Sequence, residues 1–318
     1  MDKDAKIFVA GHRGLVGSAI VRQLQARGHD DLLLRTHAEL DLTAQSAVEQ
    51  FFASERPEYV FLAAAKVGGI QANLAQPAEF IRENLLIQTN VIDAAWRHGV
   101  RKLQFLGSSC IYPKFARQPI SEDQLLAAPL EPSNEAYAVA KIAGIEMCKA
   151  YRRQHGFAAI CLMPTNLYGP GDNFDPRNSH VLSGLLRRFH EAKQSSAPAV
   201  TVWGSGQPRR EFLHADDLAD AAIFLMERYD SEEIINVGTG KDISIAELSE
   251  LIRAIVAYEG EIAFDTTRPD GTPRKLLDIS RLETMGWRPR IALREGIEKT
   301  YQWYRQHATA AQSATQKV

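Results

Sequence analysis

Tyr137 and Lys141 are the two residues whose types and spacing most directly suggest chemistry. They lie four positions apart in a run of good helix formers. Residues at i and i+4 share one face of a helix, so a phenol and an ammonium can point into one cleft. A phenol titrates near ~10, but a fixed neighbouring cation favours the phenolate and lowers the pKa toward neutrality. The pair could therefore exchange a proton with an alcohol or ketone, provided that the chain also supplies a cofactor.

A glycine-rich turn near the N-terminus supplies a candidate cofactor site. Gly11, Gly14 and Gly17 stand between a short apolar run at 6–10 and an amphipathic helical pattern at 15–27. In such a strand-turn-helix unit the glycines let the backbone approach a pyrophosphate, whose charge lies at the helix N-terminus. A bare glycine triplet is weak evidence, but this one has the required context, so the sequence predicts dinucleotide binding.

Residues after the predicted second strand, 31–34, favour NADPH over NADH. An NAD-preferring enzyme usually places an acid ~20 residues after the glycines to bind the ribose hydroxyls. Here Arg35 follows the strand with His37 close by, and Arg13 in the glycine loop adds a second guanidinium for a 2′-phosphate. Alternatively, Arg35 is a solvated loop cation. Asp41 could reach the adenine or cap the following helix.

Strand and helix patterns alternate along the first half of the chain, which predicts a doubly wound parallel sheet of the Rossmann type. Further strands are expected at 59–63, 102–106 and 159–163, and helices at 46–54, within 77–97 and from 134 to about 155. We place an NADP-binding domain at 1–170 and a smaller, mainly substrate-binding α/β lobe at 171–318. Residues 212–230, where a strand feeds a helix, are expected to rejoin the first domain.

The fourth predicted strand runs into two hydroxyls and a thiol, Ser108, Ser109 and Cys110. Ligands of open α/β sheets bind at the carboxyl edge of the strands, so Ser108 could hydrogen-bond the oxygen that Tyr137 protonates. A Ser at a strand end is otherwise most often a turn former, and a free Cys is often a small buried hydrophobe. The position of Cys110 just past a strand end favours a reactive thiol.

In the second half, an imidazole and two guanidinium groups could reach a substrate. His180 begins a predicted helix after a polar loop at 171–179 and titrates near ~6.5 when unperturbed. If the loop covers the cleft, His180 reaches the substrate. Arg209 and Arg210 could clamp a diphosphate or could pair with nearby acids.

Two helix starts are also marked in this half. Asp216 and Asp217 begin a helical pattern, where an N-cap role is favoured over catalysis. Ser244 and Glu247 have the spacing of a capping box for the helix that follows.

Composition limits the classes of partner. The 318 residues are 45% hydrophobic, which is ample for a core, and the net charge of −2 gives no electrostatic footprint for nucleic acid or an anionic membrane. Residues 1–6 are charged, and no apolar run approaches the ~18 residues of a membrane span, so we expect a cytoplasmic protein with small-molecule partners. Cys110, Cys148 and Cys161 lack metal-ligand spacing, so neither a metal site nor a disulfide framework is expected.

Taken together, these residues resemble the extended short-chain dehydrogenase/reductase family that acts on nucleotide sugars. The resemblance rests on the glycine triplet, Ser108, the Tyr137 and Lys141 pair, and the closing turn at 286–289. Longer and more specific runs lie at 65–69, 107–113, 163–170, 172–174 and 270–275, and the similarity extends from about residue 6 to 305. Within the family, the chain looks like members that act on GDP-4-keto-6-deoxy-D-mannose as 3,5-epimerases and NADPH-dependent 4-reductases.

Roles for individual residues follow from the resemblance. Ser108, Tyr137 and Lys141 would form the reductase triad, with Cys110 and His180 as the acid/base pair of epimerisation. The implied substrate-binding positions are Arg188, Trp203, Arg210 and Asp270. The implied cofactor-binding positions are Gly11, His12, Arg13, Gly14, Leu15, Val16, Gly17, Arg35, His37, Asp41, Leu106, Gly107, Ser108, Ser109, Tyr137, Lys141, Pro164, Thr165, Asn166, Leu167 and His180. The resemblance also implies a homodimer. His37 stands where a second arginine is expected, which reduces the margin of NADPH over NADH.

The implied chemistry uses a ketone at C4 to acidify the hydrogens on C3 and C5. Cys110, as a thiolate favoured by local cations, would remove a proton, and His180 would return one. Tyr137 and Ser108 would stabilise the enolate oxygen, and Tyr137 would later protonate it during reduction. Two alternatives stay open. Another epimerase or dehydratase of the family is one, although a dehydratase should carry an Asp-Glu pair where Ser109 and Cys110 stand. A catalytically silent NADP-binding regulator is the other, although all five candidate catalytic residues are present.

Overall fold

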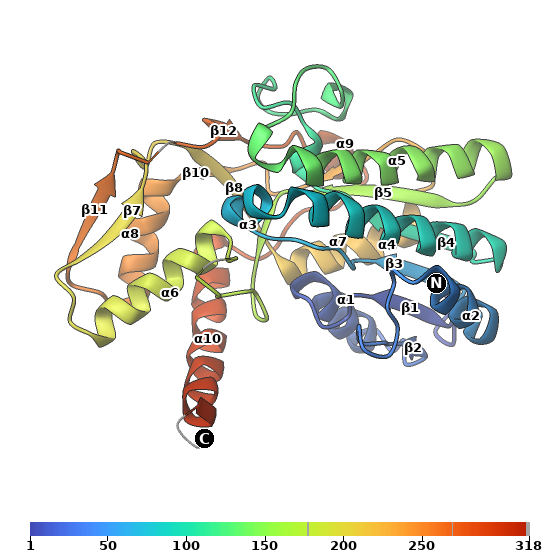
Figure 1. Ribbon diagram of the computed structural model, residues 1–318, viewed down its shortest axis with the longest axis horizontal. Helices are drawn as coiled ribbons and strands as arrows, with labels where there is room; N and C mark the ends of the chain where they lie inside the picture. Colours follow the sequence, from blue (N-terminus) through green and yellow to red (C-terminus); the bar gives the residue numbers. More distant parts are fainter. Residues whose placement is uncertain (177, 269, 316–318) are drawn as a thin grey trace.

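A six-stranded parallel sheet forms the centre of the computed structural model, which describes residues 1–176, 178–268 and 270–315 (Figure 1). The strand order is β2-β1-β3-β4-β5-β9, and the pairings between these strands are all parallel. In that order the strands are Leu32–Leu33, Ile7–Ala10, Tyr59–Leu62, Lys102–Leu106, Ala159–Pro164 and Ile235–Val237. The predicted doubly wound fold is confirmed. Strand order reverses between β1 and β3, which is where such folds bind their ligands.

Helices cover both faces of this sheet and bury two separate apolar cores (Figure 1). On one face, α1 (Leu15–Ala26) packs against α7 (Ala215–Arg228). On the other lie α2 (Gln45–Glu55), α4 (Pro77–Arg97) and α5 (Glu135–His155). Side chains alternate between the faces along each strand, so Phe8 enters one core and Ile7 the other. Both are buried because both faces are covered, which explains the continuous apolar runs of the strands.

A second lobe packs beside the carboxyl edge of the sheet (Figure 1). Its helices share a third apolar core and are α6 (Val181–Gln194), α8 (Ile245–Val256) and α10 (Leu293–Thr315). Its strands are β6 (Asn166–Tyr168), β7 (Ala199–Trp203), β8 (Arg209–His214), β10 (Asp242–Ser244), β11 (Glu261–Asp265) and β12 (Arg274–Lys275). Strand β8 pairs with β6, β10 and β12, and β7 pairs with β11. The chain returns to the large sheet through α7 and β9.

Short helices complete the described part of the chain. They are α3 (Ile70–Ala75), α9 (Ser280–Thr284) and the 3-10 turns η1 (Ser109–Ile111), η2 (Glu122–Gln124) and η3 (Pro132–Asn134). Among the described residues, no helix is long and apolar enough to cross a bilayer. No group of three potential metal ligands comes together in the same described ranges.

The two predicted helix starts have different outcomes. The capping box of Ser244 and Glu247 is present at α8, with both reciprocal hydrogen bonds formed. At α7 the N-cap is His214, whose Nδ1 accepts from the backbone N–H of Asp216 at 3.2 Å. The predicted N-cap role of Asp216 and Asp217 is therefore wrong, because both carboxylates lie inside the first helical turn.

Candidate active site

Helix α5 places Tyr137 and Lys141 against the end of β4. The Nζ atom of Lys141 donates a hydrogen bond to the carbonyl of Leu106 at 2.8 Å. It lies 5.9 Å from the centre of the Tyr137 ring and 4.7 Å from that of Phe105. Lys141 is 4% exposed, and burial lowers its pKa to about 8. A backbone carbonyl at the strand end therefore fixes the ammonium beneath the phenol.

The phenol of Tyr137 does not show the predicted downward shift. Burial raises the pKa of Tyr137, and a negative charge on Cys110 would raise it further, while a hydrogen bond with Ser108 acts in the opposite direction. The prediction was wrong because desolvation penalises the phenolate, and because the Lys141 charge is itself disfavoured by burial. Tyr137 is consequently a neutral phenol near neutral pH, which is the state required of a proton donor.

Ser108 and Cys110 lie at the carboxyl end of β4, as predicted. The hydroxyl oxygen of Ser108 accepts from the backbone N–H of Cys110 at 3.2 Å, which fixes its position at the start of η1. Ser109 is 3% exposed, whereas Ser108, Cys110 and Tyr137 remain partly accessible. A hydroxyl, a thiol and a phenol, each partly accessible, thus lie close together at the end of the strand.

A lysine that the sequence reasoning did not single out also reaches this group. The Nζ of Lys275 lies 3.8 Å from the Sγ of Cys110. Lys275 belongs to the run at 270–275 that contributed to the family resemblance, so a signal was present. Its role was missed because the contact joins residues 165 positions apart.

His180 comes from the second lobe, as the N-cap of α6. Its side chain is accessible to solvent, and the protein atoms around it lower its pKa by desolvation. The preceding loop is tied to the large domain, since Gly69 N–H donates to the carbonyl of Asn178 at 3.2 Å. His180 is therefore a neutral imidazole near neutral pH, with one ring nitrogen to donate a proton and the other to accept one.

The glycine turn has the shape that a pyrophosphate requires. Gly11 has a φ of +83°, and a Cβ on Gly17 would lie 2.1 Å from the carbonyl oxygen of Gly11. The N-cap of α1, Gly14, offers no side-chain cap, and the first turn carries no acid, so its backbone N–H groups are available to an anion. The Nδ1 atom of His12 is buried and has no hydrogen-bond partner among the residues that the structure describes. These features fit a bound dinucleotide.

Of the three cations expected near a 2′-phosphate, one is held by an ion pair and two are exposed. Arg35 pairs with Glu55 at 2.7 Å, and its guanidinium lies 5.7 Å from the ring centre of Phe51. Arg13 and His37 are exposed. Arg35 is therefore a held side chain, and the alternative of a freely solvated loop cation does not apply.

Asp41 has a local role in this structure. Its Oδ1 accepts from the backbone N–H and the hydroxyl of Thr43, at 2.9 and 2.7 Å, and these hydrogen bonds lower its pKa. The N-cap of α2 is Ala44, so Asp41 closes a turn before the helix and does not cap it. His37 Nδ1 lies 3.8 Å from this carboxylate.

The other predicted cofactor segments meet at the carboxyl edge of the sheet. Gly107 N–H donates to the carbonyl of Leu162 at 2.9 Å, so the ends of β4 and β5 lie side by side. The segment 164–167 leaves β5 for β6, where Thr165 N–H donates to the carbonyl of Val237 at 3.0 Å. Asn166 donates from Nδ2 to the carbonyl of Glu211 at 2.8 Å. Leu106 to Ser109 and Pro164 to Leu167 are thus adjacent in space, as cofactor-lining segments should be.

Arg188 and Arg210 are enclosed cations whose hydrogen-bond partners, among the described residues, are backbone carbonyls. Arg188 donates from Nη1 to the carbonyl of Thr201, and Arg210 to that of Arg209, both at 2.8 Å. Burial lowers the pKa of both guanidinium groups. Neither guanidinium has an ion pair among the described residues, although the charges of Asp270 and Glu131 act on Arg210 from a distance. A guanidinium with unused donors suits a phosphate-bearing ligand.

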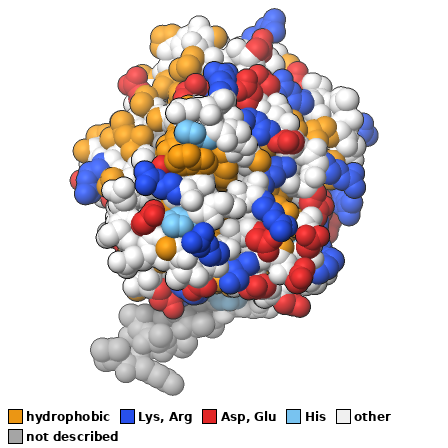
Figure 2. All heavy atoms as spheres, turned by 90° about the vertical axis from the view of Figure 1, so that its right-hand side faces the viewer, with side chains coloured by type: hydrophobic (Ala, Val, Ile, Leu, Met, Phe, Trp, Pro, Cys, Tyr) orange, Lys and Arg blue, Asp and Glu red, His pale blue; other side chains and the backbone are white. Residues whose placement is uncertain are grey.

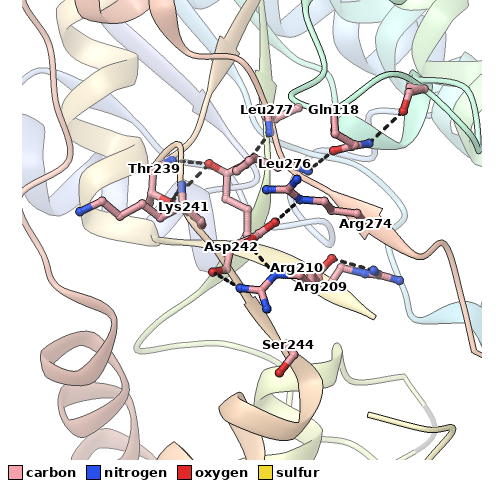
Figure 3. Close-up of polar contacts among 12 residues, drawn as sticks. Gln118, Arg209, Arg210, Thr239, Lys241, Asp242, Ser244, Arg274, Leu276 and Leu277 are labelled. Atoms are coloured by element: carbon pink, nitrogen blue, oxygen red, sulfur yellow. Dashed lines mark hydrogen bonds and ion pairs between the residues drawn. The ribbon is translucent and has the colours of Figure 1, made fainter. Parts of the chain in front are cut away.

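The neighbouring Arg209 behaves differently. Its guanidinium pairs with Asp242 at 2.8 Å and with Glu247 at 3.2 Å, and Figure 3 shows it directed at Asp242. The sequence left open whether Arg209 and Arg210 pair with acids or bind a diphosphate, and the structure separates the two residues. Arg209 is engaged in ion pairs, and Arg210 retains its charge for a ligand.

Trp203 and Asp270 lie near one another in the second lobe. The carboxylate of Asp270 accepts from the backbone N–H and the hydroxyl of Ser205, at 2.8 and 2.6 Å. Trp203, two residues before Ser205, is 51% exposed, and the guanidinium of Arg268 lies 5.2 Å from its ring centre. A carboxylate beside an accessible aromatic surface suits a planar ligand group that carries hydrogen-bond donors.

Comparisons with known proteins agree with this geometry. The NAD dependent epimerase/dehydratase family model matches residues 7–238. The chain is 64% identical over 303 residues to GDP-L-fucose synthase 1 of Arabidopsis thaliana, covering 95% of this chain and 94% of the plant protein. It is 56% identical over 310 residues to GDP-L-fucose synthase of Escherichia coli (strain K12), covering 94% and 96% respectively.

A solved structure extends the likeness to three dimensions. A GDP-mannoheptose C4 reductase from Campylobacter jejuni with NADP bound has a TM-score of 0.89 and 42% identity, covering 96% of this chain and 99% of that one. Family model, relatives and structure all span the glycine turn, the end of β4 and α5. The chain therefore belongs to the NAD dependent epimerase/dehydratase family, in the group of the GDP-L-fucose synthases.

Proposed function

We propose that this protein converts GDP-4-keto-6-deoxy-D-mannose into GDP-L-fucose, by epimerisation at C3 and C5 followed by NADPH-dependent reduction at C4. The observation that carries the proposal is the position of Cys110, a thiol at the strand end that also holds Ser108 and faces Tyr137. Ser108 and Tyr137 account for ketone chemistry at C4, and the thiol adds a base for the carbon atoms on either side. The protein is then an oxidoreductase with isomerase activity.

Epimerisation begins when the Cys110 thiolate removes a proton from C3 or C5. The electron pair moves to the C4 oxygen, where Tyr137 and Ser108 donate hydrogen bonds to the enolate. His180, a neutral imidazole on the second lobe, returns a proton to the opposite face of the carbon. Two groups from different lobes can act on opposite faces of a sugar placed between them, as inversion requires.

Reduction uses the same oxygen. Bound NADPH supplies the hydride for C4. Tyr137 donates its proton to the C4 oxygen while Ser108 holds that oxygen in place, and the resulting phenolate forms above the ammonium of Lys141. Lys141 is held by Leu106 and can stabilise this transient negative charge without moving.

The chain fits NADPH at the residues described above. The Gly11 to Gly17 turn and the open start of α1 would hold the pyrophosphate, and the buried Nδ1 of His12, which has no partner in the described part of the chain, could bond to the cofactor. Arg13 and Arg35 would meet the 2′-phosphate, which requires Arg35 to share its guanidinium between Glu55 and the phosphate. The NADP in the related Campylobacter reductase supports this assignment.

The substrate would lie against the second lobe. Arg188 and Arg210 would bind the diphosphate, because each guanidinium bonds only backbone carbonyls among the described residues and has donors left for a ligand. Trp203 and Asp270 would contact the base, and a guanine has ring N–H groups for the carboxylate. In this proposal the chain divides at about residue 170, with the cofactor bound mainly by the residues before it and the substrate mainly by those after it.

The rival functions fit the site less well. A nucleotide-sugar epimerase or dehydratase acting elsewhere on the sugar leaves Cys110 without a task. A silent NADP-binding regulator leaves unexplained why Tyr137, Ser108 and Cys110 lie close together and partly accessible. We therefore keep the epimerase-reductase.

Two further parts of the proposal concern the whole protein. We place it in the cytoplasm, where GDP-sugars and NADPH are available to a chain without a described membrane-spanning helix. We also propose a homodimer through α4 and α5, whose outer sides carry apolar residues such as Val139, which is 40% exposed.

The decisive experiment supplies the protein with GDP-4-keto-6-deoxy-D-mannose and NADPH, follows NADPH oxidation, and identifies the product by NMR. We expect GDP-L-fucose, with solvent deuterium at C3 and C5 when the reaction is run in deuterium oxide. A product reduced at C4 without inversion would reject the epimerase half of the proposal. Absence of NADPH oxidation would reject the whole.

A further inference from the structure

The sulfur of Cys110 faces a positive charge from a distant part of the chain. The Nζ of Lys275 lies 3.8 Å from the Sγ of Cys110. Its neighbour Arg274 is paired with Asp242, but Lys275 has no carboxylate within ion-pair distance in residues 1–176, 178–268 and 270–315. A half-buried ammonium without an acidic partner favours an anion beside it, and a thiolate is such an anion.

Strand pairing sets the position of Lys275. Strand β12 is parallel to β8, and Lys275 stands opposite Arg210 in the register. Residues opposite one another on neighbouring strands lie side by side, so the pairing brings Lys275 next to a residue of the proposed diphosphate site. Lys275 therefore lies beside Arg210 in the sheet, and its side chain reaches the sulfur of Cys110.

Two side chains from other elements hold the residues that follow Lys275. The backbone N–H of Leu276 donates to Oε1 of Gln118 at 2.9 Å, and that of Leu277 donates to Oε2 of Glu211 at 3.0 Å. Figure 3 shows Gln118, Leu276 and Leu277 together beside β12. Lys275 is thus attached to a segment fixed at two consecutive peptide groups.

Glu211 joins this segment to a second turn. It is fully buried, and its Oε1 accepts from the backbone N–H groups of Thr239 and Gly240, at 2.5 and 2.8 Å. Burial raises the pKa of Glu211, while its hydrogen bonds to the backbone lower it. The buried carboxylate follows Arg210 directly in the sequence, so one residue ties β8, the turn at 239–240 and the segment after Lys275 together.

Two cations lie near Cys110, and the carboxylates of Asp270 and Glu131 act on one of them, since both raise the pKa of Arg210. Lys275 on β12 and Arg210 on β8 supply positive charge, and Tyr137 on α5 is a neutral phenol near neutral pH. A negative charge on Cys110 raises the pKa of Arg210, in opposition to burial, so the two groups interact. Of these two cations, it is Lys275 whose nitrogen contacts the sulfur, at 3.8 Å.

We propose that Lys275 is a further residue of the active site, whose ammonium stabilises the Cys110 thiolate, and that Glu211 is the positioning residue that holds it there. The inference deepens the proposed function, because the thiolate is the base of epimerisation. In that step an S–H bond forms as the C–H bond breaks, and the electron pair moves to the C4 oxygen. The thiol then releases its proton to solvent, and Lys275 stabilises the anion that is formed again.

Alkylation of the substrate-free protein by iodoacetamide tests the proposal without using catalysis. The reagent is neutral, so its attraction to the site does not change when a lysine is removed. Cys148 and Cys161 are 1% and 2% exposed, so the fast reaction reports Cys110, and Cys110→Ser gives the background. We expect Lys275→Met to slow alkylation about tenfold at neutral pH, and the difference to vanish at alkaline pH, where both thiols are ionised.

Three variants separate charge from structure. Lys275→Arg keeps the charge and should remain near the wild-type rate, and Lys275→Gln should match Lys275→Met. Lys241→Met removes an exposed lysine of the same lobe and should leave the rate unchanged. Glu211→Gln should slow alkylation, but should add nothing to Lys275→Met, because it acts through Lys275. NADPH affinity confirms that each variant is folded.

The outcomes distinguish this inference from the proposed function. If folded Lys275→Met or Lys275→Gln is alkylated at the wild-type rate, the inference is overturned. A lysine that only binds substrate would give this result, because its loss would raise KM without changing alkylation of the substrate-free protein. If the lysine variants slow alkylation as expected but Cys110→Ser still exchanges deuterium at C3 and C5, the pairing of charges stands and the assigned role of Cys110 fails.

Discussion

At the scale of single residues, the site combines a phenol that is difficult to ionise with an ammonium that is easy to deprotonate. Burial raises the pKa of Tyr137 and lowers that of Lys141 to about 8, so desolvation reduces the charge of both. The arrangement favours a phenol that holds its proton until a negative oxygen develops beside it. Substrate chemistry at C4 then supplies the driving force for proton transfer.

Replacing Tyr137 by Phe removes that proton donor and leaves the thiol in place. We expect NADPH oxidation to fall by about 10²- to 10⁴-fold, the range typical of general acid catalysis. Deuterium incorporation at C3 and C5 should fall less, because Ser108 still stabilises the enolate oxygen. Measuring both rates on the same preparation tests the assignment, and unchanged NADPH oxidation would remove Tyr137 from the reaction.

Replacing Cys110 by Ser should have the opposite selectivity. A hydroxyl is a far weaker base than a thiolate, so solvent-deuterium incorporation at C3 and C5 should fall by about 10²-fold or more. NADPH affinity should not change, since the glycine turn is untouched. Mass spectrometry of the recovered nucleotide sugar measures the incorporation, and a normal rate in this variant would exclude the thiol as the base.

At the scale of elements, sequence patterns predict the parts of the structure whose signals are local. Strands β1, β3, β4 and β5 are apolar runs buried on both faces, and α8 begins with a capping box that is readable from Ser244 and Glu247. Strands β10 and β12 have only three and two residues and exist because β8 pairs with them. Their positions depend on contacts distant in sequence, and for this reason Lys275 and Glu211 were not predicted as part of the site.

The loop before α6 contains a titratable group whose effect on stability follows from its burial. Asp172 is 8% exposed, and its Oδ1 accepts from the backbone N–H of Asn173 at 2.7 Å. Burial raises its pKa to about 6, while hydrogen bonds from Asn173 and Ser183 oppose this shift. The native state therefore binds more protons than the unfolded state between the ordinary carboxyl pKa and about 6.

The sign of the pH dependence is thus opposite to that of a salt-bridged aspartate. The Asp172 contribution makes the free energy of unfolding fall as pH rises through this window, by about 1 to 3 kcal/mol in total. Asp172→Asn removes the titration, so the variant should be more stable than the wild type near neutral pH, and the difference should diminish in acid. Urea unfolding at several pH values measures this, and parallel curves for the two proteins would contradict it.

At the scale of the whole molecule, the two lobes contribute different parts of one reaction. The large domain carries Ser108 and Cys110 after β4 and Tyr137 on α5, whereas His180, Arg188 and Arg210 come from the second lobe. Neither lobe alone holds both an acid and a base for inversion. Two contacts hold the residues of the two lobes in position. Gly69 bonds the loop before His180, and Glu211 bonds the segment that follows β12.

The last prediction concerns the outer side of α4 and α5, which pack against each other along the large sheet. Val139 is 40% exposed there, and Leu85, Leu86 and Met147 are only partly buried. Figure 2 shows hydrophobic side chains gathered on the upper left of the face formed by the ends of these helices, with charged residues around them. Contiguous apolar surface of this kind is typical of an interface between protein chains.

If two copies of the chain pack through these helices, Val139→Glu should dissociate the dimer, because it buries a charge without a partner. Sedimentation velocity would then show a single species of monomer mass for the variant and of twice that mass for the wild type. Glu146→Gln on the same helix removes a charge without adding one and serves as the matched control, which should remain dimeric. A wild-type protein that sediments as a monomer at micromolar concentration would reject the dimer, and would leave the catalytic assignments intact, because every proposed catalytic residue belongs to one chain.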